Sequence, residues 1–222
     1  MKKANIVTVL LVSLAVSTNA SAVIYGGVDF PDGPVSFADS VTIFSPVIQS
    51  GQPTAQHLIP ERALGIPDDP SGTSAGAGYV SLGDGGSITL QFTDNSLTGS
   101  GNNDDDLWIF EVGPDIEDTF VEISKNNSDW FSVGAVTGST QGVDIDAFGW
   151  GVLDFFSFVR LTDDPDKDGQ SGNTVGADID AVGAISSAPP VDIPAVPVPA
   201  AVWLFGTALI GLVGFSKRRK AA

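Results

Sequence analysis

Short runs of alternating apolar and polar residues, separated by turns rich in Gly, Asp, Ser and Asn, fill the middle of the chain. The run SITLQF at residues 87–92 alternates with period two, as expected for a strand with one buried face. Residues 106–112, DLWIFEV, alternate in the same way and place Glu111 on the face of Leu107 and Ile109. Further strands are expected over residues 35–44, 79–82, 120–124, 130–136, 155–161 and 179–185.

This pattern predicts an all-β fold, because no stretch before the C-terminal tail keeps a helical period. Many short strands joined by Gly-rich turns favour an antiparallel β-sandwich of jelly-roll-like form. Residues 51–78 contain many prolines and glycines and are expected to form a long loop. A loop of that length inside a domain usually has a functional role.

The two ends of the chain have a different pattern. Residues 1–22 combine Lys2 and Lys3, an apolar stretch and the small-residue triplet Ala20-Ser21-Ala22, which predicts a signal peptide cleaved after Ala22. Residues 23–187 are the expected folded domain, and residues 188–199 form a Pro-rich linker. Residues 200–216 are apolar and predict a short transmembrane helix, and residues 217–222 form a basic tail that should stay cytoplasmic.

The order of motifs in this tail is specific. Val196, Pro197, Val198 and Pro199 precede an apolar run, which is followed by Lys217, Arg218, Arg219 and Lys220. This arrangement resembles the PEP-CTERM sorting tail, in its VPxP-type variant, of exported proteins of Gram-negative bacteria. The resemblance implies that an exosortase cuts at the proline motif, after a transient stay in the inner membrane, and releases the protein to the cell surface or the extracellular space. An ordinary C-terminal membrane anchor is the alternative.

Charge and composition narrow the function. Only four of the 10 basic residues lie in residues 23–187, against 26 of the 27 acidic residues, which gives this segment a net charge of −22. Such a domain should repel nucleic acid, because it cannot replace the counterions of phosphates. Cysteine is absent, which excludes disulfides and thiolate-bound metal. Packing or bound cations must therefore stabilise the domain.

The domain also contains a series of short motifs in a fixed order from about Leu64 to Ile185. These are ALGIPDD, YVSLGDGGSITLQF, DLWIFE, VEIS, VRLTD and DIDAVGAI. The series resembles β-sandwich domains of cell-surface proteins that carry the same kind of tail. The resemblance implies a galactose-binding-like or jelly-roll sandwich without an assigned activity.

Carboxylates dominate the candidate chemistry. Asp104 and Asp106 belong to an acidic run just before an expected strand, and Glu111 lies within that strand on an apolar face. Asp178 and Asp180 alternate on another expected strand. A buried carboxylate needs a partner or a metal, and calcium is the hard cation that carboxylate oxygens hold outside the cell. We therefore expect Asp106, Glu111, Asp178 and Asp180 to converge on a calcium site, with Asp104 as a further ligand. The alternative is that the loop aspartates are solvated and that Glu111 pairs with Arg160.

A weaker second candidate is the run Asp164-Pro165-Asp166-Lys167-Asp168-Gly169, which matches the first half of an EF-hand-type calcium loop. The match then fails, because Val175 occupies the twelfth position in place of glutamate. A plain polar turn is the alternative for this segment, with Asp164, Asp166 and Asp168 as candidate ligands if it binds calcium.

No enzymatic motif stands out. The single histidine, His57, lies in the long loop, and no Gly-x-Ser-x-Gly elbow precedes a helix. We therefore expect a non-catalytic, calcium-stabilised surface or matrix protein. The alternative is a carbohydrate-binding module for exopolysaccharide that uses Trp150 and the loop of residues 51–78. A glycosidase is a third interpretation, because two carboxylates suffice for that chemistry.

Overall fold

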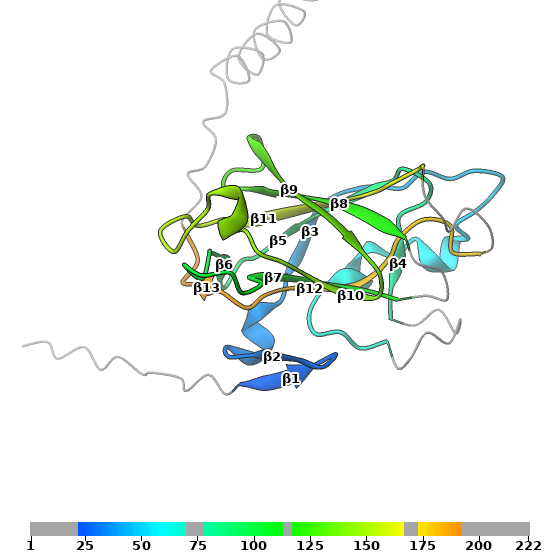
Figure 1. The fold of residues 1–222 in the computed structure, drawn as a ribbon. Helices are drawn as coiled ribbons and strands as arrows, with labels where there is room; N and C mark the ends of the chain where they lie inside the picture. The colour runs from blue at the N-terminus through cyan, green and yellow to red at the C-terminus, as the bar shows by residue number, and fades with distance from the viewer. Residues whose placement is uncertain (1–21, 70–77, 113–116, 167–172, 192–222) are drawn as a thin grey trace, which may run out of the picture. The chain divides into compact units, whose positions relative to one another are not determined.

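The computed structural model describes residues 22–69, 78–112, 117–166 and 173–191. In these ranges the main structure is two antiparallel sheets stacked face to face (Figure 1). One sheet has the strand order β3–β5–β11–β8–β9, and every neighbouring pair is antiparallel. Its strands are β3 (Ser40–Ser45), β5 (Ser87–Gln91), β8 (Asp118–Ser124), β9 (Trp130–Thr137) and β11 (Phe158–Asp163).

The second sheet has the order β10–β7–β12–β4. Its strands are β4 (Val80–Ser81), β7 (Leu107–Glu111), β10 (Thr140–Val143) and β12 (Asp178–Ala184). The strand β7 lies between β10 and β12, so residues at both of its ends have neighbours from two other strands. A bulge interrupts the pairing of β12 with β7 between Ile179 and Ala181, and Asp180 is the extra residue.

Short elements complete the described structure. Two small ribbons pair β1 (Val23–Tyr25) with β2 (Val28–Phe30), and β6 (Ser96–Leu97) with β13 (Ser187–Ala188). The 3-10 turns are η1 (Gly33–Ser36), η2 (Ala55–His57), η3 (Pro60–Ala63) and η4 (Asp146–Phe148).

The main core fills the space between the two sheets with aliphatic side chains from both. Its inward positions alternate along the strands, as the period-two pattern predicts, and include Ile88, Leu90, Leu107, Ile109, Val159, Leu161 and Val182. A smaller aromatic cluster covers the other face of the four-stranded sheet, where Phe30 and Phe37 pack against Phe110. The β1–β2 ribbon lies on this side (Figure 1).

On the outer face of the five-stranded sheet, Arg160 has an acidic partner other than Glu111. The guanidinium of Arg160 forms a 2.6 Å ion pair with Glu122 on the neighbouring strand and lies 4.3 Å from the ring centroid of Trp130. Arg160 therefore pairs with Glu122, and the suggested Glu111–Arg160 pair is wrong.

The predicted all-β antiparallel sandwich is confirmed. Each expected strand has a counterpart, although the first half of the expected strand at residues 35–44 is the turn η1 followed by an irregular segment. The described part of the expected long loop, residues 51–69, contains η2 and η3. None of the helices in the described ranges has the length and apolar character needed to cross a bilayer. The predicted signal peptide and transmembrane helix lie outside these ranges, apart from Ala22.

Candidate metal centre

The pairing of β7 with β10 places two acidic segments side by side. Val143, the last residue of β10, lies opposite Leu107, the first residue of β7. The residue before β7 therefore lies beside the segment that follows β10, and the N–H of Asp106 donates to the carbonyl of Val143 at 2.9 Å. Asp106 and Asp144 are brought together by strand register, although 38 positions separate them in the sequence.

Asp106 is the buried member of the site. Its side chain is fully buried, and Oδ2 accepts a 2.9 Å hydrogen bond from the N–H of Ile145. Oδ1 has no hydrogen-bond partner among the described residues. Burial raises the pKa of this carboxyl, against the lowering effect of nearby Ser186, Ile145 and Ser100 groups. Neither serine forms a hydrogen bond to Oδ1, so this buried oxygen has no donor to compensate it.

Asp146 is held in place by the loop before β7. Its Oδ2 accepts hydrogen bonds from the N–H of Gly101 at 3.0 Å and from the hydroxyl of Ser100 at 3.3 Å. Gly99 lies so close that a Cβ at that position would come within 2.7 Å of the same oxygen. Asp144 is oriented by the turn that follows it, since its Oδ1 accepts a hydrogen bond from the N–H of Ala147 at 3.2 Å.

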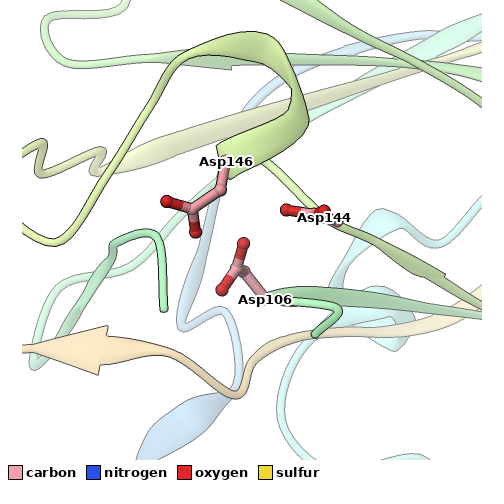
Figure 2. A group of neighbouring side chains, drawn as sticks. All are labelled: Asp106, Asp144 and Asp146. Atoms are coloured by element: carbon pink, nitrogen blue, oxygen red, sulfur yellow. The ribbon is translucent and has the colours of Figure 1, made fainter. Parts of the chain in front are cut away.

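The three carboxylates form one group. Figure 2 shows Asp106, Asp144 and Asp146 pointing toward one another from the start of β7, the end of β10 and the start of η4. One oxygen from each lies within 4.8 Å of those of the other two. Two oxygens that bind one calcium ion at about 2.4 Å can be at most about 4.8 Å apart, so one metal ion could contact all three carboxylates, and calcium is among the ions that such an all-oxygen ligand set accepts. Asp144 and Asp146 are half-buried, which leaves room for water to complete the coordination.

Asp144 and Asp146 are not among the residues singled out from the sequence. A signal for them is present, because Asp144-Ile145-Asp146-Ala147 repeats the letters of Asp178-Ile179-Asp180-Ala181. The local sequence does not show that β7 pairs with β10, and this pairing brings the repeated letters next to Asp106. Asp105 adds to the negative field, and its pKa is raised by burial and by the charges of Asp144 and Asp104.

The structure divides the expected calcium ligands between separate places. Asp106 lies in the triad, whereas Glu111 is at the other end of β7. Four intervening residues at about 3.3 Å per residue keep the two ends of the strand roughly 16 Å apart. The expected convergence of Asp106 with Glu111 is therefore wrong. Asp104 is exposed, and its N–H donates to the side chain of Asn102 at 2.6 Å.

Asp178 and Asp180 lie near the Glu111 end of β7, because Ile179 between them is opposite Glu111. Asp178 is directly opposite Ser81, whose hydroxyl donates to Oδ1 of Asp178. Burial raises the pKa of Asp178 to about 8. The two carboxylate oxygens of Asp180 accept the N–H groups of Asp68 and Asp69 at 3.2 and 3.4 Å, and burial raises its pKa to about 6.

The remaining predicted residues lie elsewhere. Asp164 and Asp166 form a local turn, in which the N–H of Asp166 donates to Oδ1 of Asp164 at 3.0 Å, and Asp168 lies outside the described ranges. Ala22 is exposed, and Val196, Pro197, Val198 and Pro199 also lie outside these ranges.

Trp150 is half-buried, and its ring packs on the core. Its ring centroid lies 4.6 Å from that of Phe131 and 5.3 Å from that of Phe156. The Nζ of Lys125 lies 5.5 Å from the same ring. The exposed apolar side chains of this loop are those of its neighbours Phe148, Val152 and Leu153.

Comparison with known proteins gives only distant structural similarity. No family model and no curated protein sequence matches the chain. One similar solved structure is a truncated AlyQ with CBM32 and alginate lyase domains, with a TM-score of 0.37, 11% identity and coverage of 74% of this chain. The match spans 36% of that AlyQ chain, about a third of its length. Another is the C-terminal domain of a chitobiase from Bacteroides fragilis, with a TM-score of 0.37, 16% identity and coverage of 68% of this chain and 94% of that one.

Proposed function

We propose that residues 23–187 form a non-catalytic, calcium-stabilised β-sandwich that is exported and released to the cell surface or the extracellular matrix. The observation that carries this proposal is the Asp106, Asp144 and Asp146 triad, with its unpartnered buried oxygen on Asp106. A cation there would join the segment before β7 to the segment after β10. In a chain without cysteine, such a joint takes the place of a disulfide.

The surroundings of His57 support a non-catalytic role. This side chain is only 1% exposed, and its ring stacks on Tyr79 with centroids 5.4 Å apart. Burial lowers its pKa, with a further contribution from the charge of Arg62. A general base must reach a substrate, and a histidine buried in this way does not.

Calorimetric titration of the purified full-length chain with calcium tests the proposal. We expect the wild type to bind calcium and Asp144→Asn to lose the binding at the triad, because the substitution removes an anionic ligand without changing side-chain size. Asp104→Asn is the matched control, since Asp104 belongs to the same acidic run but lies outside the triad. Equal binding heats for the wild type and Asp144→Asn would contradict the proposal.

A second candidate function is carbohydrate binding, and one observation favours it. The triad residue Asp146 begins η4, and the same loop exposes Phe148 by 48% and Leu153 by 82%. Exposed rings can stack on sugars, so a calcium-fixed loop of this kind suits an exopolysaccharide ligand. Glycan-array binding that needs calcium and is lost in Phe148→Ala would support this function. Binding that is unchanged in that variant would assign the ligand to another surface.

The export route remains part of the proposal. The signal-like residues 1–22 and the sorting-like tail from Val196 support processing by an exosortase-type enzyme after a transient stay in the inner membrane. The large negative charge of the domain disfavours nucleic acid as a partner.

A further inference from the structure

One long stretch of this acidic domain has no charged side chain. Residues 40–60 contain no Asp, Glu, Lys or Arg, and no other run of this kind between Asp29 and Asp192 is as long. Residues 23–187 carry a net charge of −22, so a neutral stretch of this length is unusual for the domain. The stretch contains β3 and the segment that leads to the start of η3.

The strand β3 lies at an edge of the five-stranded sheet. In the described ranges its only strand partner is β5, on one side. The other edge strand, β9, continues through Gly138 and Ser139 into β10 of the second sheet, so the chain itself joins the two sheets there. An edge strand presents unpaired N–H and C=O groups, and charged side chains or proline usually guard it. The strand β3 contains neither, and its pairing with β5 is irregular only at the bulge between Val41 and Ile43.

Exposed isoleucines lie beside this edge. Ile43 belongs to β3, and Ile48 follows the end of the strand by three residues. Ile59 directly precedes η3, which packs against β3. A single exposed apolar side chain is ordinary on a protein surface. Three of them beside an unpaired, uncharged strand form a candidate interaction surface, and we call β3 with Ile48 and Ile59 the β3 edge.

The charge distribution indicates which partner fits the β3 edge. A basic ligand would be drawn to the acidic surfaces of the domain and would gain nothing at a neutral edge. A second copy of the chain has the same negative charge, so it approaches with least repulsion where charge is absent. Beside the edge, Glu61 and Arg62 on η3 have opposite signs. Asp84 accepts a 2.8 Å hydrogen bond from Gln49 of the neutral stretch. The β3 edge therefore suits a partner as acidic as the domain itself.

We propose that the β3 edges of two copies of this chain pair antiparallel about a two-fold axis and join their five-stranded sheets into one sheet. Each copy then satisfies the free backbone groups of the other, and Ile43 lies near the axis. The two Asp39 side chains, one at the start of each strand, fall at opposite ends of the paired segment. At about 3.3 Å per residue this keeps them roughly 20 Å apart. This interface goes beyond the proposed function and requires neither calcium nor a glycan.

Sedimentation velocity of the full-length chain, from micromolar to submillimolar concentration in one detergent, tests the interface. We expect the wild type to dimerise and Ile43→Lys to weaken the dimer by more than about tenfold, because it places like charges near the axis. The substitution makes the whole chain less negative, so greater overall repulsion cannot explain a loss of dimer. Phe120→Lys is the matched control, because Phe120 is 45% exposed against 50% for Ile43 but lies on the inner strand β8. This variant should dimerise like the wild type.

Added salt and chelator identify the origin of the association. Salt should strengthen the dimer, because it screens the repulsion between two acidic domains. Chelator should leave the dimer intact. Association that chelator abolishes would overturn the β3 interface, while the calcium site of the proposed function would stand. A wild type that stays monomeric, or equal dimerisation of Ile43→Lys and Phe120→Lys, would also overturn the interface.

The absence of cysteine from the chain permits a second test that locates the contact. A single cysteine in Ile43→Cys should form an intermolecular disulfide under mild oxidation, because the two copies of this position lie near the axis. Ser132→Cys is the control, since Ser132 is exposed on β9 at the other edge of the same sheet. Equal disulfide yields for the two variants would contradict pairing through β3.

Discussion

Asp106 immediately precedes the strand β7, and Glu111 is its last residue. Each is a buried carboxylate with one oxygen that has no described hydrogen-bond partner. Asp106 meets Asp144 and Asp146, whereas Glu111 lies opposite Ile179 and its N–H donates to the carbonyl of Ser139 at 2.7 Å. The strand β7 thus has an acidic group at each end and an apolar centre.

Calcium should raise the melting temperature of the protein, and Asp106→Asn should remove the part of the rise that is due to the triad. At a calcium concentration 100 times Kd, a site that exists only in the folded state adds about 2.7 kcal/mol, or roughly 5–10 °C for a domain of this size. The calcium-free variant should melt at or above the wild-type temperature, because the substitution removes a buried negative charge. Scanning calorimetry with calcium and with chelator measures both effects. A variant that keeps the full calcium shift would contradict the triad.

The calcium-free protein should lose stability as the pH rises above about 5. The pKa values of Asp180 and Asp178 are raised by burial to about 6 and about 8, from an ordinary value of 3.8. Between the unfolded and folded pKa values the folded state holds protons that the unfolded state releases, so these groups favour folding fully below about pH 4 and progressively less through pH 6 and 8. Urea unfolding in chelator at pH 5, 7 and 9 should show this decline. A chelated protein that is most stable at pH 9 would contradict it.

Trp150→Ala should destabilise the domain, whereas Phe148→Ala should leave its stability almost unchanged. Trp150 packs against Phe131 and Phe156, so its loss should cost roughly 2–3 kcal/mol of unfolding free energy. Phe148 is exposed, so its loss should change stability by less than about 0.5 kcal/mol. Denaturant unfolding of both variants tests this, and Phe148→Ala then becomes the variant for glycan binding. Equal stability losses would mean that Trp150 does not support the core.

Gly83→Ala should destabilise the domain by roughly 2–4 kcal/mol. Gly83 has a φ of +77°, and a Cβ there would collide with the carbonyl oxygen of Val47. Gly27 is the matched control, because its φ is +86° but nothing lies within 4 Å of its Cβ position, so Gly27→Ala should cost only about 1 kcal/mol. Equal losses in urea unfolding would show that backbone strain, and not the collision, sets the cost.

Mass spectrometry of protein secreted by a host with an exosortase should find a chain that starts at Val23 and ends near Pro199. The expected basis is the signal-like residues 1–22 and the Val-Pro-Val-Pro segment at 196–199. Replacing Pro197 and Pro199 by Ala should keep the uncut chain in the inner membrane. A mature chain that still ends at Ala222 would favour an ordinary membrane anchor.

The strands could be predicted because their pattern is local. Alternation in SITLQF and DLWIFEV places β5 and β7 within about one residue of their observed bounds, and it also places Glu111 on a buried face. The ligand set could not be predicted in this way. Asp144 joins Asp106 only through the pairing of β7 with β10, and β10 contains Gly142 and the polar residues Thr140 and Gln141, which hide its strand character.

The bulge at Asp180 allows β12 to pack into the core and to hold a neighbouring loop at the same time. Because the extra residue interrupts the alternation, Ile179 and Val182 both pack in the core although three positions separate them, and Asp180 is free to hold the N–H groups of Asp68 and Asp69. A chain with Asp180 deleted would have a regular strand with the same two core residues and no anchor for that loop. Insertion of one residue into a strand is thus a route by which a sandwich can gain a tethered loop without any change to its core.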